Sequence, residues 1–142
     1  MLAIVAGILV TRHIKTADEL FESKATPRTE ALIAAFASFP EDVKDAIGYA
    51  LYVAQRGGKH PDAKPLRGFG GGGILEIVED YAGDTYRAVY TVRLAGRIYV
   101  LHVFQKKSKG GIKTPKAEIE LIKSRFTRAE EEHARWLEAH KE

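Results

Sequence analysis

Basic side chains are concentrated in one window of the sequence. Residues 85–117 contain eight lysines and arginines and no carboxylate, whereas the rest of the 142-residue chain contains 14 basic and 19 acidic residues. The eight are Arg87, Arg93, Arg97, Lys106, Lys107, Lys109, Lys113 and Lys116. A basic surface of this kind favours a polyanionic partner. A solvated lysine loop without a partner is the simpler alternative.

The other residue types limit the chemistry that the chain can do. It has no cysteine, which excludes disulfides, thiolate zinc sites and a cysteine nucleophile. Its five histidines lack paired metal-ligand spacing and no G-x-S-x-G motif occurs, so we expect no metal and no other cofactor. Arginine and lysine suit the cleavage of RNA by its own 2′-hydroxyl, which needs an aligned backbone and a stabilised pentacoordinate phosphate. They would equally suit an RNA clamp without catalysis.

Residues 57–73 are predicted to form a loop, and its glycines have the pattern G-x-G-x-x-G at Gly68, Gly70 and Gly73. Dinucleotide-binding glycines follow a strand and open a helix, whereas these precede a predicted strand. We therefore expect turns here and no dinucleotide site.

Three predicted strands position the basic side chains, at residues 74–80, 85–94 and 97–105. Their short connections make neighbouring strands antiparallel, which predicts a three-stranded meander. In the middle strand we expect one face, with the apolar residues, to pack on a helix. The opposite face carries Arg87 and Arg93, and we expect it to be open.

Helical patterns flank the predicted sheet. Residues 16–38 are predicted to be helical in two pieces, and Pro40 starts a second pattern that ends at Gly57-Gly58. A last helix over residues 115–140 would be about 39 Å long at 1.5 Å per residue, so we expect its end to project or to contact another chain. Its apolar seam is Ile119, Ile122, Phe126, Ala129, His133 and Trp136.

The chain begins with the apolar run MLAIVAGILV. The run is too short to span a bilayer and no basic residue precedes it, so we expect a buried or edge strand and no membrane association. A signal peptide and a misassigned start codon are the alternatives. The whole chain is predicted to be one globular domain.

Three stretches together resemble the phage-derived, HigB-type toxins of the RelE/ParE superfamily. They are KPLRGFGGGGILEIVED, DTYRAVYTVR and YVLHVFQKKSKGGIKTPKAEIELIKSR. The resemblance covers roughly residues 40–130, so residues 40–142 are assigned to the toxin-like domain and residues 1–39 to a poorly matched, partly helical extension. It implies an α+β fold in which a small twisted antiparallel sheet packs on an N-terminal helical hairpin, with a long C-terminal helix.

The resemblance also implies a function. RelE-like members are toxins of type II toxin–antitoxin systems and cleave messenger RNA without a metal, often on the ribosome, which predicts a cytoplasmic endoribonuclease. The implied partner is a helix-turn-helix antitoxin similar to HigA. ParE-like relatives instead inhibit DNA gyrase, and an inactive member that binds only its antitoxin or RNA is a third alternative. An oligomer through the C-terminal helix also stays open.

Carried over residue by residue, the resemblance predicts a catalytic set of Arg87, Lys107 and His102. Arg87 matches the phosphate-binding arginine of the family, and Lys107 lies where these toxins have basic residues. His102 would replace the family's missing acid or base, because Glu76 stands where RelE has lysines and the family's tyrosine has no counterpart. Further contacts to RNA phosphates are expected from Lys64, Arg67, Arg93, Lys106, Lys109 and Lys113.

Structural roles are the alternatives for these residues. Arg87 could form an ion pair with Asp84 or Glu76, and the lysines could contact acidic residues of an antitoxin. His102 could be a core residue, because its predicted strand face is otherwise apolar. That face carries Ile98, Val100 and Phe104.

Overall fold

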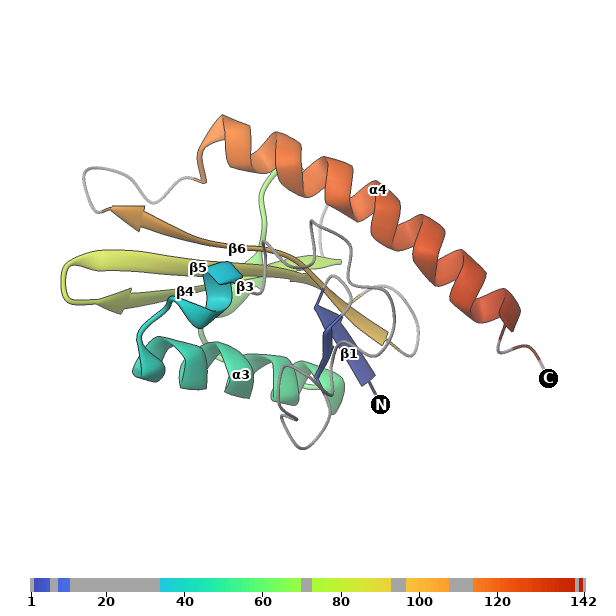
Figure 1. Ribbon diagram of the computed structural model, residues 1–142, viewed down its shortest axis with the longest axis horizontal. Coiled ribbons are helices and arrows are strands. Elements are labelled where there is room, and N and C mark those ends of the chain that lie inside the picture. Colours follow the sequence, from blue (N-terminus) through green and yellow to red (C-terminus); the bar gives the residue numbers. More distant parts are fainter. Residues whose placement is uncertain are drawn as a thin grey trace.

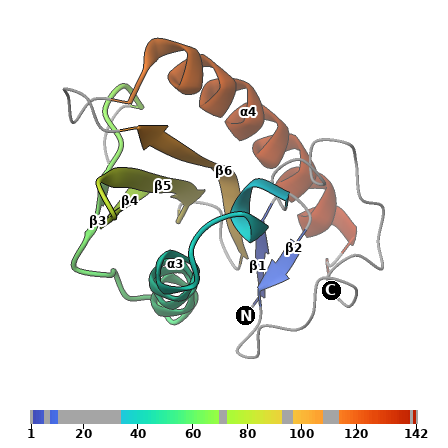
Figure 2. The same ribbon diagram turned by 60° about the vertical axis from the view of Figure 1, so that its left-hand side comes forward.

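The structure, a computed structural model, describes residues 2–5, 8–10, 34–69, 73–92, 97–107, 114–139 and 141. These residues form a sheet with one long helix on each face (Figure 1). Figure 2 shows the helices α3 (Glu41–Gln55) and α4 (Lys116–Ala139) on opposite sides of the strands. The predicted α+β class is confirmed.

The described part of the sheet has six strands in the order β2-β1-β6-β5-β4-β3. Four of them form an antiparallel meander, rather than the three that the sequence predicted. They are β3 (Ala63–Pro65), β4 (Ile74–Tyr81), β5 (Asp84–Thr91) and β6 (Arg97–Lys107). The additional strand is β3, which lies in the segment predicted to be a loop.

The N-terminal apolar run forms two short strands, β1 (Leu2–Val5) and β2 (Ile8–Val10). β1 pairs parallel with β6, and β2 pairs antiparallel with β1. The prediction of a strand is therefore confirmed, and β2 lies at one edge of the described sheet, with β3 at the other.

Helix α3 (Glu41–Gln55) begins after Pro40, as predicted. Its end is a Schellman motif, in which the Gly57 amide donates to the Ala54 carbonyl at 3.0 Å and the Gly58 amide to the Val53 carbonyl at 2.9 Å. Gly57 has a φ of 83°, which residues with a Cβ rarely adopt. Of the helical pieces predicted over residues 16–38, residues 34–37 are helical and residues 16–33 lie outside the described residues.

The α3 side of the sheet is an apolar core. Tyr86, Ala88 and Tyr90 of β5 face α3, as the alternation predicted. They pack with Phe39, Val43, Ile47, Ala50, Leu51, Ala54, Ala63, Leu75, Ile77, Ile98, Val100 and Val103.

Helix α4 (Lys116–Ala139) covers the other face. Its predicted seam is confirmed, since Ile122, Ala129 and His133 are buried. Because α4 lies on this face, the expectation of an open surface around Arg87 is wrong, and Arg87 is only 2% exposed. Within the described part of the chain, every helix is too short or too polar to pass through a lipid bilayer.

A bulge in β6 changes the direction of its side chains. Val89 of β5 pairs with His102, whereas Tyr90 pairs with Val100, so Leu101 is an extra residue in β6. The alternation therefore shifts by one residue. His102 points to the α4 side and does not share the face of Val100, which corrects the predicted placement.

Candidate functional site

The strand register aligns residues of four strands on the α4 side. Lys64 of β3 pairs with Glu76 of β4, which pairs with Val89 of β5. Val89 in turn pairs with His102 of β6. Arg87 lies two residues before Val89 on the same face. Antiparallel pairing thus brings together candidate residues that are up to 38 positions apart in the sequence.

Glu76 and Arg87 form a buried ion pair under the start of α4. The Arg87 Nη1 atom donates to Oε2 of Glu76 at 3.2 Å, and the two side chains are only 3% and 6% exposed. The hydroxyl of Thr114 donates to the same oxygen at 2.9 Å and accepts a hydrogen bond from Arg87 Nη1 at 3.3 Å. Of the ion pairs considered from the sequence, the structure therefore has the one with Glu76.

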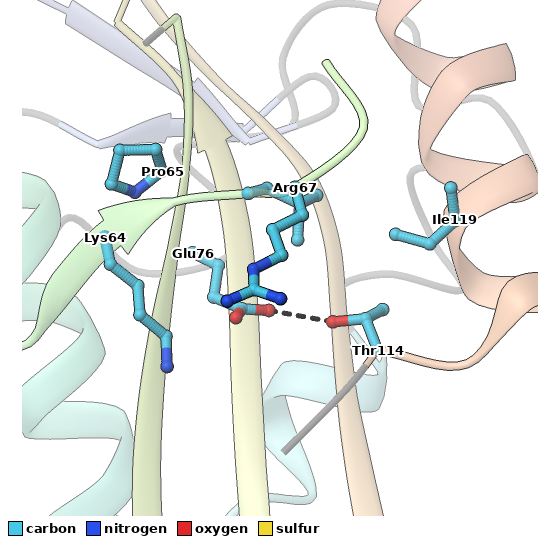
Figure 3. Close-up of a pocket in the computed structure, with 7 residues that line it drawn as sticks. Lys64, Pro65, Arg67, Glu76, Thr114 and Ile119 are labelled. Carbon is cyan, nitrogen blue, oxygen red and sulfur yellow. Dashed lines mark hydrogen bonds between the residues drawn. The ribbon is translucent and has the colours of Figure 1, made fainter. Parts of the chain in front are cut away.

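A pocket of about 420 Å³ opens next to this ion pair (Figure 3). Lys64 of β3 and Arg67 of the following turn are exposed and lie at its mouth, with the Arg67 side chain directed toward Glu76 in Figure 3. Glu76 is buried and forms the inner wall with Thr114. Arg87 itself does not line the pocket. The remaining walls are the apolar residues Pro65, Leu66 and Ile119.

His102 lies in the same row of residues but is covered by α4. Its Nε2 atom is paired with Glu118, and its Nδ1 accepts a hydrogen bond from Nη1 of Arg125 at 2.9 Å. These partners imply a neutral ring with the proton on Nε2. Burial lowers the pKa of His102 and the Arg125 charge adds to this effect, while Glu118 opposes it. Because both nitrogens are engaged, proton transfer by His102 would require one of these contacts to open.

The other predicted site residues lie along β6 or beyond it. Lys106 is half-buried and pairs with Thr85, and Lys107 is the last residue of β6, with its backbone opposite Asp84. The structure thus brings Lys64 and Arg67 together at one pocket and places Lys106 and Lys107 at the end of the sheet. Three predicted contacts lie outside the described residues: Arg93, Lys109 and Lys113.

Glu76 and Thr114 are the pocket residues that the sequence did not identify as candidates. A signal was present for Glu76, because it interrupts the otherwise apolar start of the predicted strand ILEIVED. A carboxylate buried in a strand needs a cation or hydrogen-bond donors. No comparable signal exists for Thr114, which reaches Glu76 only because α4 begins on the same side of the sheet.

This arrangement determines what the pocket can bind. The two cations at the mouth suit phosphate groups, while the inner wall offers carboxylate and hydroxyl oxygens to hydrogen-bond donors. Among the described residues, no group of three or more histidine, aspartate or glutamate side chains is placed to hold a metal ion.

Comparison with known proteins identifies one family. Residues 34–127 match the family model described as "Phage derived protein Gp49-like (DUF891)". The matched range includes α3, the four-stranded meander, the pocket and the first half of α4. No curated protein and no solved structure matches the chain.

Proposed function

This chain belongs to the Gp49-like family of phage-derived proteins, and on that premise we propose that it is the toxin of a type II toxin–antitoxin system and cleaves messenger RNA. The resemblance of residues 40–130 to HigB-type toxins supports the toxin assignment. An mRNA target would place its action in the cytoplasm. Its proposed inhibitor is a helix-turn-helix antitoxin.

The observation that carries the proposal is the position of the Glu76–Arg87 ion pair at a pocket with a basic mouth. A buried ion pair is weak evidence for a stabilising role, because apolar residues of similar size often stabilise a fold equally well. Buried charges beside a cleft are instead candidates for function. Lys64 and Arg67 at the mouth supply the positive charge that a nucleic-acid backbone needs.

In the proposed reaction, Lys64 and Arg67 contact the scissile phosphate. The 2′-hydroxyl oxygen attacks the adjacent phosphorus, the bond to the 5′-oxygen breaks, and the two cations stabilise the charge on the pentacoordinate phosphate. Lys106 and Lys107 at the end of β6 hold the flanking backbone. His102 is the candidate that takes the proton from the 2′-hydroxyl and returns a proton to the leaving 5′-oxygen, on condition that its contact with Glu118 or Arg125 opens.

Arg87 has an indirect role in this proposal. Its guanidinium is held by Glu76 and Thr114 and does not line the pocket. It therefore acts as a positioning residue that fixes the Glu76 carboxylate, rather than as the phosphate contact predicted from the sequence.

The test is induction of the protein in a bacterial host, followed by mapping of new RNA 5′ ends across the transcriptome. The pocket variant is Lys64→Ala, Arg67→Ala. Its matched control is Lys123→Ala, Arg128→Ala, which removes the same charge from exposed positions on α4. We expect growth arrest and new ends within coding regions for the unmodified protein and the control, and a loss of both in the pocket variant.

Other results would support other functions. Growth arrest with DNA-damage signalling and intact messenger RNA would indicate a gyrase inhibitor. New 5′ ends that persist in the pocket variant would place the nuclease site elsewhere. An absence of growth arrest in every strain would indicate an inactive member. Suppression of the arrest by a co-expressed helix-turn-helix antitoxin would identify the partner.

A further inference from the structure

We propose that the pocket holds a single nucleobase and selects guanine, with Glu76 and Thr114 as the residues that read it. This inference rests on the proposed function, because an RNA strand is the expected source of the base. Lys64 and Arg67 contact the phosphate groups of the same strand outside the pocket.

The first step is the hydrogen-bonding capacity of the inner wall. Oε2 of Glu76 accepts from Arg87 and Thr114, whereas Oε1 accepts no hydrogen bond from the residues that the structure describes. The hydroxyl proton of Thr114 is donated to Glu76, so its oxygen can only accept from a ligand. The wall therefore presents acceptors and no donors.

The second step is that these acceptors are held in place. Glu76 lies within β4, and its carboxylate has two partners, Arg87 of β5 and Thr114, which lies two residues before α4. Selective binding needs groups that are fixed before the ligand arrives. A buried carboxylate of this kind loses little freedom when it accepts a further hydrogen bond.

The third step is that the pocket separates base from phosphate. An acceptor-only wall with a carboxylate repels a phosphate group, so phosphates stay at the mouth with Lys64 and Arg67. The apolar side walls of Pro65, Leu66 and Ile119 can pack on a planar base instead. The volume of about 420 Å³ lies within the range of roughly 300–1,000 Å³ that is typical of small-ligand pockets.

The fourth step is the choice among the four bases. Guanine presents two adjacent donors, the N1–H and the N2 amino group, to a pair of acceptors. Adenine and cytosine each present one amino group next to a ring nitrogen that itself accepts. The N3–H of uracil lies between two carbonyl oxygens, which the Glu76 carboxylate would repel. We therefore expect guanine to bind best and uracil worst.

The experiment measures the binding of four trinucleotides, UGU, UAU, UCU and UUU, with 2′-O-methyl groups that prevent cleavage. We expect UGU to bind on the order of 10- to 100-fold more tightly than UUU, as for a good bidentate contact. Thr114→Val should reduce this ratio several-fold while retaining Glu76 and Arg87. Thr127→Val on the exposed face of α4 is the matched control and should leave the ratio unchanged.

The outcomes separate this inference from the proposed function. Equal binding of the four trinucleotides, or no binding, would overturn the guanine pocket and leave RNA cleavage as proposed. A preference for UGU in a protein that cleaves no RNA would support the pocket and overturn the cleavage. Equal affinity for UGU and free guanosine, which has no phosphate, would overturn the assignment of an RNA strand as the source, since Lys64 and Arg67 would then contribute nothing.

Discussion

The two faces of the sheet bury different kinds of side chain. On the α3 side the core is apolar. The Tyr90 hydroxyl is buried there without a hydrogen-bond partner among the described residues, and burial raises its pKa to about 12. Apart from tyrosines, the α4 side contains every polar or charged residue that is buried in the described part of the chain. These are Glu76, Arg87, Thr91 and His133.

This difference separates the part of the molecule that stabilises the fold from the part that we propose for binding. Apolar side chains such as Ile47 each stabilise the folded state by about 1.5–3 kcal/mol when fully buried. Charges such as those of Glu76 and Arg87 lose several kcal/mol of hydration each, which their attraction only partly offsets. The α4 side therefore contains an arrangement that stability alone does not require.

The largest effect is expected when the buried ion pair is broken on one side. Arg87→Met should lower the free energy of unfolding by about 3–5 kcal/mol, because it leaves the Glu76 carboxylate buried without its cation. The double variant Glu76→Leu, Arg87→Met should recover most of this loss. Urea denaturation followed by circular dichroism measures both.

A loss of less than about 1 kcal/mol of unfolding free energy in Arg87→Met would contradict this expectation. A double variant that is less stable than Arg87→Met would contradict it as well. In either case the two faces would not differ in the way that we infer. The double variant should also lose trinucleotide binding, because stability and binding depend on different properties of the ion pair.

The second effect concerns the apolar face. Ile47→Ala, at a fully buried position of α3, should lower the free energy of unfolding by about 2–5 kcal/mol through loss of apolar contacts and a residual cavity. The same denaturation measurement tests this. For the protein that remains folded, the relative affinities for UGU and UUU should not change. A changed ratio would show that the α3 side also shapes the pocket.

A smaller effect is expected from pH and His102. The pKa of His102 is lowered in the folded state, so the unfolded chain binds a proton more readily. Its contribution to stability is complete above the ordinary histidine pKa of about 6.5 and is lost as the pH falls through the lower folded-state value. Burial of the ring is the main reason that protonation is unfavourable in the folded state, and the Arg125 charge adds to it, whereas Glu118 favours the protonated ring.

Unfolding free energies measured between pH 5 and pH 8 test this expectation. As the pH falls, the unfolding free energy should decrease less in His102→Gln than in the unmodified protein. Parallel pH profiles would mean that other groups dominate the acid sensitivity.

The smallest effect on stability is expected at the mouth of the pocket. Lys64→Ala and Arg67→Ala should each change the free energy of unfolding by no more than about 0.5 kcal/mol, because both residues are exposed. Binding of UGU should nevertheless weaken and depend less on salt concentration. Salt titrations of the binding affinity provide the measurement. An unchanged salt dependence would show that Lys64 and Arg67 do not contact the phosphate groups.

Local patterns predicted much of the fold. The end of α3 follows from Gly57, which can adopt a positive φ, and the seam of α4 follows from apolar residues at helical spacing. The different side chains on the two faces of β5 follow from the alternation of successive residues along a strand. Each of these features depends on residues that are close in the sequence, so their physical causes can be read from short stretches.

Features that depend on distant residues were missed or misplaced. Strand β3 has three residues and includes Pro65, and only pairing with β4 reveals it. The bulge at Leu101 depends on how β6 aligns with β5, and it turned His102 away from its predicted face. The prediction of an exposed Arg87 was wrong because strand periodicity does not indicate that α4 covers the face of the sheet opposite α3.

The sequence by itself determined the α+β class, the principal helices and strands, and the basic character of residues 85–117. It also determined membership of the Gp49-like family. Only the tertiary structure decided that Glu76 meets Arg87 and Thr114, and that Lys64 and Arg67 share a pocket with them. The reason is physical: helix and strand periodicities arise from neighbouring residues, whereas charge pairing and pocket shape arise from residues that pack together across the sheet.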